Sequence, residues 1–299
     1  MFNGFSHSVM GASHERRGIV CQDSSAFEVG NGYAAVVVAD GHGSKKHFRS
    51  NVGSACATEA ALETIKKFYA DPDAFDENMR TGHKRIIRNI EKQVISLWNE
   101  KVLAHLDANP VTQDELSKFS YEEFEEIPYE SYYGTTLIAA VAGRGYTFGF
   151  QIGDGSLVAV FEDGETSMIM DYEESNPANI TSSMCNANAA SMFDQFYVDN
   201  KRLLAICVST DGLYTSFGSD YDFLDYHTII ASQLTNVDGF ITSLKNNMVK
   251  RSHYGTEDDI SLACVYDVEL AQEKHDVIKA KVIENKRLAA ERKAKLLGR

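Results

Sequence analysis

Three short apolar runs in this sequence each end in a small residue followed by Asp-Gly, at residues 36–41, 150–155 and 207–212. Aliphatic and β-branched runs are typical of strands. Asp-Gly is typical of turns, because Asp bonds its own backbone and Gly permits positive φ. Two more acidic elements stand before strand-like runs: Asp23 precedes residues 26–29, and Asp258-Asp259 precedes Ile260. Any fold of this chain must therefore accommodate carboxylates at several strand ends.

The other elements follow from periodicity. Strand-like runs bounded by Gly, Asp or Asn lie at residues 33–39, 136–142, 146–152, 157–161, 203–209 and 260–266. Apolar residues at helical spacing predict helices over residues 52–69, 81–106, 223–234 and 240–249. Asp71-Pro72 predicts a break between the first two helices. The order is not a regular strand–helix alternation, and it favours antiparallel sheets with helices packed outside them.

Two segments differ from the rest in composition. Residues 116–133 are acidic and aromatic, and we expect a solvated surface insertion there, with a partner contact as the alternative. Residues 269–299 hold nine Lys or Arg against five Asp or Glu, and Ala, Lys, Glu and Leu dominate them. This composition predicts a helix. A solvated extension and a helix that docks a partner both remain open.

Composition excludes several classes of protein. With 299 residues, 43% of them apolar, and only 4 prolines, the chain can bury one large core, and one domain is favoured. A formal charge of −14 repels nucleic acids and anionic membranes, so neither is an expected partner. The five cysteines form no CxxC pair, which indicates thiols in a reducing compartment. No signal peptide or membrane span is evident, and we predict a cytoplasmic protein.

The acidic strand ends suggest metal chemistry. Carboxylates that converge without Lys or Arg partners repel one another at neutral pH, and a divalent cation resolves that repulsion. Oxygen ligands without a Cys/His cluster favour Mg²⁺ or Mn²⁺ over zinc. Two such ions sharing a water would lower the pKa of that water and support an in-line attack on phosphorus. Taken singly, each Asp-Gly is also an ordinary turn.

His42 stands beside the proposed centre, two residues after Asp40. Because an imidazole titrates near neutrality, His42 is a candidate to donate a proton to a departing serine or threonine oxygen. The alternative is a histidine that only hydrogen-bonds and orients a ligand carboxylate.

Five motifs together resemble a known family. They are Asp40-Gly41-His42-Gly43, Gly134-Thr135-Thr136, Gly153-Asp154-Gly155, Asp211-Gly212 and Asp258-Asp259-Ile260-Ser261. Their order and spacing resemble those of metal-dependent serine/threonine phosphatases of the protein phosphatase 2C type. Ser6-His7 and Cys21-Gln22-Asp23 resemble the opening motif of its bacterial branch. The resemblance runs from about residue 6 to residue 266.

The resemblance implies an α+β fold, in which a central sandwich of two antiparallel β-sheets is flanked by α-helices in α-β-β-α layers. It implies a catalytic domain over residues 1–267, followed by a basic helical extension over residues 268–299. The implied activity is hydrolysis of phosphoserine or phosphothreonine in a phosphoprotein substrate. The implied cofactors are two Mg²⁺ or Mn²⁺ ions, with a third and weaker ion in some members.

The resemblance also assigns residues to the metals, namely Asp40, Gly41, Asp211, Asp258, Asp154 and Asp23. Asp40 would bridge both ions, and the carbonyl of Gly41 would bind one of them. Asp211 and Asp258 would complete the other site. Asp154 matches the third metal, and Asp23 would hold waters or lie outside the ligands. Residues 172–196, with Asn179 and Thr181, would form a mobile flap over the site.

Two departures from the family pattern concern the substrate phosphate and the outer shell of the metals. The family's phosphate-clamping arginine falls on Gly18 here, and Arg16, Arg17 or His14 are the candidates to replace it. The glutamate before the opening aspartate is Gln22, which removes one charge.

Three functions are consistent with these residues. The first is an active phosphatase that needs Mg²⁺ or Mn²⁺. The second is a catalytically weakened phosphoprotein-binding or regulatory module on the same fold, suggested by Gly18. The third is a two-metal phosphoesterase for small phosphates, because fold does not fix substrate. The retained aspartates favour the first.

Overall fold

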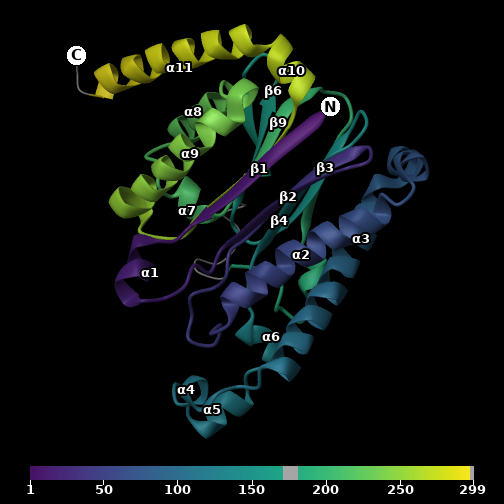
Figure 1. Ribbon diagram of the computed structural model, residues 1–299, viewed down its shortest axis with the longest axis vertical. Helices are drawn as coiled ribbons and strands as arrows, with labels where there is room; N and C mark the ends of the chain where they lie inside the picture. Colours follow the sequence, from purple (N-terminus) through teal and green to yellow (C-terminus); the bar gives the residue numbers. More distant parts are fainter. Residues whose placement is uncertain (171–180, 297–299) are drawn as a thin grey trace.

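The computed structural model describes residues 1–170 and 181–296, and two five-stranded antiparallel sheets stacked on each other form its centre (Figure 1). One sheet has the order β1-β10-β9-β6-β7, and the other has the order β2-β3-β4-β5-β8. The strands are β1 (Phe2–Val9), β2 (Ser24–Gly30), β3 (Tyr33–Ala39), β4 (Leu137–Ala142), β5 (Thr147–Ile152), β6 (Ser156–Phe161), β7 (Thr166–Met170), β8 (Asp194–Val198), β9 (Leu203–Ser209) and β10 (Ile260–Asp267). The predicted sandwich is confirmed.

Strand β3 shows why the sheets stack. Successive side chains of a strand point to opposite faces, and every residue of β3 is buried. Ala35 and Val37 join the apolar layer beneath the helices, whereas Val36 and Val38 join the layer between the two sheets. A third apolar layer lies between the first sheet and its own helices. Strand β3 is therefore apolar on both faces because one face packs against helices and the other against the opposite sheet.

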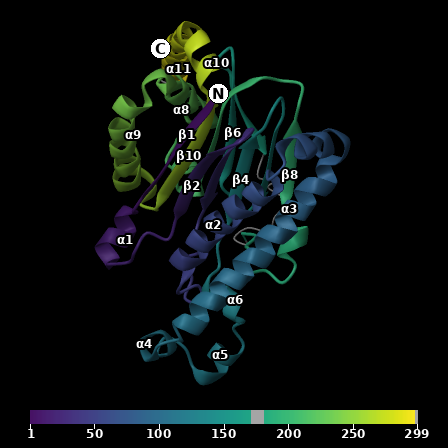
Figure 2. The ribbon, with the colours of Figure 1, turned by 45° about the vertical axis from the view of Figure 1, so that its right-hand side comes forward.

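One pair of long helices, α2 (Ser50–Phe68) and α3 (Pro72–Ala108), covers the second sheet (Figure 2). The Trp98 indole N–H of α3 donates to the Gly53 carbonyl of α2 at 3.0 Å. Asp71 caps α3 and Pro72 opens it, as the predicted break requires. The helix starts nine residues earlier than predicted, because a non-helical backbone at Gly82 interrupts its apolar periodicity.

Helices of the C-terminal third cover the first sheet. They are α7 (Asp211–Tyr214), α8 (Asp220–Ala231), α9 (Val237–Arg251), α10 (Val268–Glu273) and α11 (His275–Leu296). The predicted basic helix is present, and part of it packs on the rest of the chain (Figure 1). Ile278 is buried, Lys281 pairs with Glu165 at 2.6 Å, and Arg292 pairs with Asp225 at 3.1 Å. The division after residue 267 stays a prediction.

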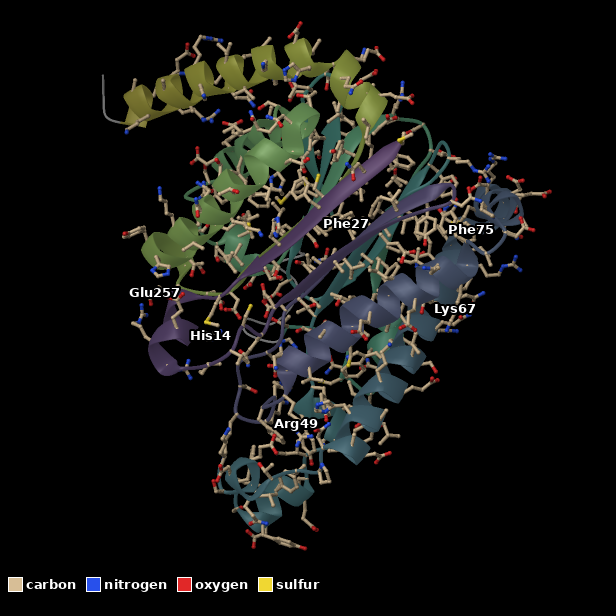
Figure 3. The ribbon with its side chains drawn as sticks, viewed as in Figure 1. His14, Phe27, Arg49, Lys67, Phe75 and Glu257 are labelled. Atoms are coloured by element: carbon tan, nitrogen blue, oxygen red, sulfur yellow. The ribbon has the colours of Figure 1, made fainter. Side chains whose placement is uncertain are left out.

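The acidic insertion is helical, and one of its neighbours is a buried arginine. In Figure 1, helices α4 (Gln113–Leu116) and α5 (Tyr121–Glu125) lie below α2 and α3, and α6 (Tyr129–Tyr132) lies beside the lower part of α3. Arg49, only 6% exposed, lies between this part and the start of α2 (Figure 3). Its guanidinium donates to both oxygens of Glu115, at 2.8 and 2.9 Å, and to the Asn109 carbonyl at 2.7 Å. The expected surface insertion is therefore helical, and Arg49 holds it against the start of α2.

Besides α4, α5 and α6, the sequence did not predict β1, β7, β8 or the short helices α1 (Ala12–Arg17) and α7. Strand β1 carries only three large apolar residues, Phe2, Phe5 and Val9, and pairs with β10 at the edge of its sheet. Among residues 1–170 and 181–296, no helix combines the length and the apolarity that crossing a lipid bilayer would need.

A buried carboxylate on α3 makes stability depend on pH. Glu91 is fully buried, and neither of its oxygens accepts a hydrogen bond, although Arg88 Nη1 lies 3.0 Å away. Burial raises the pKa of Glu91 to about 7, against the opposing effect of Arg88. The folded protein therefore binds a proton more tightly than the unfolded chain. The free energy of unfolding should fall as pH rises from about 4.5 to about 7, by at most ~3 kcal/mol from this group.

We expect Glu91→Gln to lose less stability than the unmodified protein between pH 5 and pH 8, because the amide stays neutral. Urea unfolding at both pH values measures the difference. Glu100→Gln, an exposed position on the same helix, is the matched control and should follow the unmodified protein. Parallel losses in all three proteins would contradict the assignment to Glu91.

Candidate metal centre

The strand register brings the acidic strand ends together in space. Ser24 pairs with Ala39, so Asp23 at the start of β2 lies beside Asp40 at the end of β3. The Asp40 backbone is fixed from the β4 side, since its N–H donates to Thr136 Oγ1 at 3.0 Å and its carbonyl accepts from Thr136 N at 2.9 Å. The second sheet thus places two carboxylates at one end of the sandwich.

The first sheet brings its own acids to the same end. Ser209, the last residue of β9, pairs with Leu262 of β10 and with Ser156 of β6. Asp211 follows β9, Asp258 precedes β10, and Asp154 precedes β6. Thr210 connects the two sheets, because its hydroxyl donates to Asp23 Oδ2 at 2.8 Å and accepts from Ser261 N at 2.9 Å.

The carboxylates at this end of the sandwich lie close enough to raise one another's pKa. Burial raises the pKa of Asp40 well above its usual value, and Asp23, Asp211 and Asp258 raise it further. Burial raises the pKa of Asp211 to about 6, with contributions from Asp154 and Asp258. Burial also raises the pKa of Asp23 and of Asp258. Asp40 and Asp211 each affect the pKa of the other, and a proton or a cation between the two carboxylates would relieve their repulsion.

The donor set fits hard divalent cations. It consists of oxygens, contributed by half-buried aspartates, the exposed Asp258 and the Gly41 carbonyl. Among the described residues, the ion pairs that adjoin it, His14–Asp259 and Arg16–Glu257, involve neighbours of the proposed ligands and not the ligands themselves. Within residues 1–170 and 181–296, no three acidic, His or Cys groups yet stand close enough around one point to enclose an ion. The repelled carboxylates would therefore have to turn toward a cation on binding it.

Two glycines of the predicted motifs are required by close approach. A Cβ on Gly41 would lie 2.6 Å from the Gln22 carbonyl oxygen and 2.8 Å from the Ser50 carbonyl oxygen. A Cβ on Gly212 would lie 2.1 Å from the Asp259 carbonyl oxygen. Side chains do not approach backbone so closely, so each Asp-Gly keeps its strand end against a neighbouring segment.

Asp259 was not assigned a function from the sequence, and it proves to be the hub beside the centre. Its buried carboxylate accepts from Gly11 N and Gln22 N, each at 2.6 Å, and lies 3.0 Å from His14 Nδ1. Its own N–H donates to Asp258 Oδ1 at 2.9 Å. The sequence shows only that two acids precede a strand. Which of the two is turned toward the metal centre depends on contacts with residues about 240 positions away in the chain.

His42 lies at the edge of the centre in a largely buried position. Its N–H donates to the Gly134 carbonyl at 3.1 Å, and its ring centroid lies 5.0 Å from that of His47. Burial lowers the pKa of His42 to about 4, and His47 and Lys46 contribute to the lowering. In the surroundings that the structure describes, the imidazole is therefore neutral at pH 7.

The three candidates for the substrate phosphate differ in their surroundings. His14, 8% exposed, turns inward to Asp259 and is not free to reach a phosphate (Figure 3). Arg16 pairs with Glu257 at 2.7 Å. Arg17 is exposed and has no ion pair in the described part of the chain. Gly18 ends α1 with φ of 63°, a left-handed conformation that disfavours arginine there.

The proposed flap is described only from residue 181 onward, and Asn179 lies outside the described residues. Thr181 Oγ1 donates to Asp154 Oδ2 at 2.8 Å, and Met184 N donates to the Thr135 carbonyl at 2.9 Å. The described part of this segment thus runs directly beside Asp154 and the Gly134-Thr135-Thr136 motif.

Comparison with known proteins places this arrangement in a family. The model of the protein phosphatase 2C family matches residues 10–250. None of the curated proteins compared with the chain is similar enough in sequence to match it.

Solved structures give the same fold. The serine/threonine phosphatase of S. agalactiae is 18% identical, with 89% of this chain and 99% of that chain covered and a TM-score of 0.55. For Stp1 from Staphylococcus aureus the identity is 14%, the coverage 89% and 95%, and the TM-score 0.56. The catalytic domain of the phosphatase PstP, solved with two manganese ions, is 14% identical, with 89% and 97% covered and a TM-score of 0.50.

The family model spans most of the chain, and the sandwich with acids at one end is the architecture that the five motifs predicted. The chain belongs to the protein phosphatase 2C family of protein phosphatases.

Proposed function

We propose that this protein hydrolyses phosphoserine or phosphothreonine in protein substrates, using a water held between two Mg²⁺ or Mn²⁺ ions. The observation that carries the proposal is a set of aspartates at one end of the sandwich that raise one another's pKa, while no lysine or arginine of the described residues forms an ion pair with them. Such a set is tolerated in the ionised form only with cations bound. The cytoplasmic location stays a prediction.

We assign the ligands by position. Asp40 is the candidate bridge, because Asp23, Asp211 and Asp258 all act on its pKa. Asp211 and Asp258, with the Gly41 carbonyl, are the candidates to complete the two sites, and Asp154 is the candidate for a third ion. Asp23, bonded to Thr210, would orient waters. When bound, the ions would lower the pKa of a water and stabilise charge on the phosphoryl oxygens.

Removing the ligands should abolish turnover. We expect Asp40→Asn and Asp211→Asn each to lower kcat/KM for a phosphothreonine peptide by about a hundredfold to a thousandfold, because each removes charge from the metal site. A chelator should have the same effect on the unmodified protein, and added Mn²⁺ or Mg²⁺ should reverse it. Phosphate release measures all three.

Asp107→Asn, an exposed position on α3 away from the centre, is the matched control and should keep full activity. Turnover that survives chelation would refute metal dependence. Phosphopeptide binding without turnover in saturating metal would favour the weakened binding module. Turnover of small phosphates with no turnover of phosphopeptides would favour the small-molecule phosphoesterase.

His42 is the candidate proton donor to the leaving oxygen, a role that requires the negative charge of the bound substrate phosphate to raise the pKa of its imidazole from about 4. A serine or threonine alkoxide needs a proton, whereas nitrophenolate leaves without one. We expect His42→Asn to lower kcat about a hundredfold for a phosphopeptide and much less for p-nitrophenyl phosphate. Equal losses on the two substrates would show that His42 only orients the centre.

Arg17 is the remaining candidate for the substrate phosphate, because His14 and Arg16 are engaged with Asp259 and Glu257. We expect Arg17→Gln to raise KM for p-nitrophenyl phosphate about threefold to tenfold, with little change in kcat. Arg16→Gln is the matched control, and its KM should stay near that of the unmodified protein. Equal effects of the two changes would remove Arg17 from the proposed site.

A further inference from the structure

A partly buried arginine outside the metal centre has no acidic partner within 4.0 Å among the residues that the structure describes. The Arg251 guanidinium lies over the Phe217 ring, 3.6 Å from its centroid, and 4.8 Å from the centroid of Tyr226. It donates to Asn247 Oδ1 at 3.0 Å and contacts Ser216 at 3.4 Å. In the described residues no carboxylate oxygen lies within 4.0 Å of it. Its positive charge is thus held in place by neutral groups.

Arg251 forms a wall of an open cavity of about 310 Å³. The residues that line this cavity are Ser216, Asn247, Lys250, Arg251, Tyr254 and Gly255. Two of these side chains are cationic and none is acidic, in a protein whose formal charge is −14. Tyr254, 90% exposed, adds an aromatic ring at the rim. This chemistry favours an anion on a flexible chain.

The cavity adjoins the candidate metal centre on two sides. Ser216 follows Thr215, whose hydroxyl donates to the Asp211 carbonyl at 2.9 Å. On the other wall, Gly255 precedes Thr256, and the hydroxyls of Thr215 and Thr256 lie 3.1 Å apart. Asp258 is two residues beyond Thr256. The cavity walls therefore continue directly into the loops that carry two proposed ligands.

On the side of Arg251 away from the first cavity, acidic residues are present. A second cavity, of about 440 Å³, shares Ser216 and Arg251 with the first and extends beneath α11. It is lined by Asp222 and Asp225 as well as by cations. Asp225 is paired with Arg292 and Asp222 accepts from Ser219, so these carboxylates are already engaged. An anion would therefore be held on the side that faces the metal loops.

We propose that the cavity of Arg251 and Lys250 binds an acidic side chain of the substrate polypeptide, close in sequence to the phosphorylated residue. This assignment deepens the proposed function, since it presumes that a polypeptide lies across the metal centre. It makes the cavity a determinant of substrate choice, in which a glutamate or aspartate of the substrate pairs with Arg251 and Lys250 while its phosphoryl group is at the metals.

The test compares phosphothreonine peptides that carry a single Glu at each position from −4 to +4 with peptides that carry Gln there. We expect Glu to raise kcat/KM about threefold to tenfold at one or two positions, as a partly exposed charge-assisted contact provides. In Lys250→Gln and Arg251→Gln the ratio of kcat/KM for the Glu peptide to that for the Gln peptide should fall to about 1 to 2. Activity of Lys250→Gln toward p-nitrophenyl phosphate should be unchanged.

Two further variants distinguish a loss of the Glu preference from a general failure of a variant to fold. Arg251 packs against two rings, so Arg251→Lys, which keeps the charge, should retain part of the preference where Arg251→Gln loses it. Lys245→Gln, an exposed change on the same helix outside the cavity, should keep the full preference. Equal kcat/KM for Glu and Gln peptides at every position would overturn the proposal and leave the proposed function intact.

Absence of turnover on every peptide and on p-nitrophenyl phosphate would instead count against the proposed function. Fluorescence-polarisation binding of the same Glu and Gln peptides would then test, without turnover, whether the cavity binds an acidic side chain. Tighter binding of a Glu peptide that Lys250→Gln removes would support it, and equal binding of the two peptides would overturn it.

Discussion

Mutual repulsion among the aspartates at one end of the sandwich is the constraint on which this structure depends. Burial and neighbouring carboxylates together raise the pKa of Asp40, Asp211 and Asp258, which means that the ionised cluster is unfavourable on its own. The rest of the fold must supply the stability that the cluster lacks. Three apolar layers, two beneath the helices and one between the sheets, supply it away from the acidic end.

Adjacent acids show how local donors decide between a structural and a ligand role. Asp259 accepts hydrogen bonds from two backbone N–H groups and lies against His14, so its charge is satisfied inside the protein. Asp258 receives one N–H, from Asp259 itself. Hydrogen bonds to a carboxylate favour its charged form, and the carboxylate that lacks them is the one available to a cation. The two neighbours are therefore not interchangeable.

Local patterns were sufficient for the elements that are apolar throughout. Strands β3 and β9 have the predicted limits, because each is a continuous apolar run ended by a turn. Strand β1 was missed because its sequence, with Asn3, Ser6 and Ser8, carries no such run, and only pairing with β10 makes it a strand. The convergence of the acids was predictable from repeated motifs. The strand register that brings the acids together could not be predicted, and neither could the contact between Arg49 and Glu115, which are 66 residues apart. Long-range contacts of this kind leave no local pattern in the sequence.

What distinguishes this chain lies around the centre. Gly18 closes α1 in a left-handed conformation, and α1 is held in place by Ser13 N donating to the Glu257 carbonyl at 2.9 Å and by the inward His14. An arginine at residue 18 would have to adopt that strained backbone, so the arginine that the family resemblance expects there has no counterpart at this position. The surface offers cations at the end of α1 and at the end of α9, on the two segments that meet at Glu257 and Asp258. Both segments abut a proposed ligand. Under the proposed function, a change in either surface would therefore alter which polypeptides reach the metals without altering the ligands themselves.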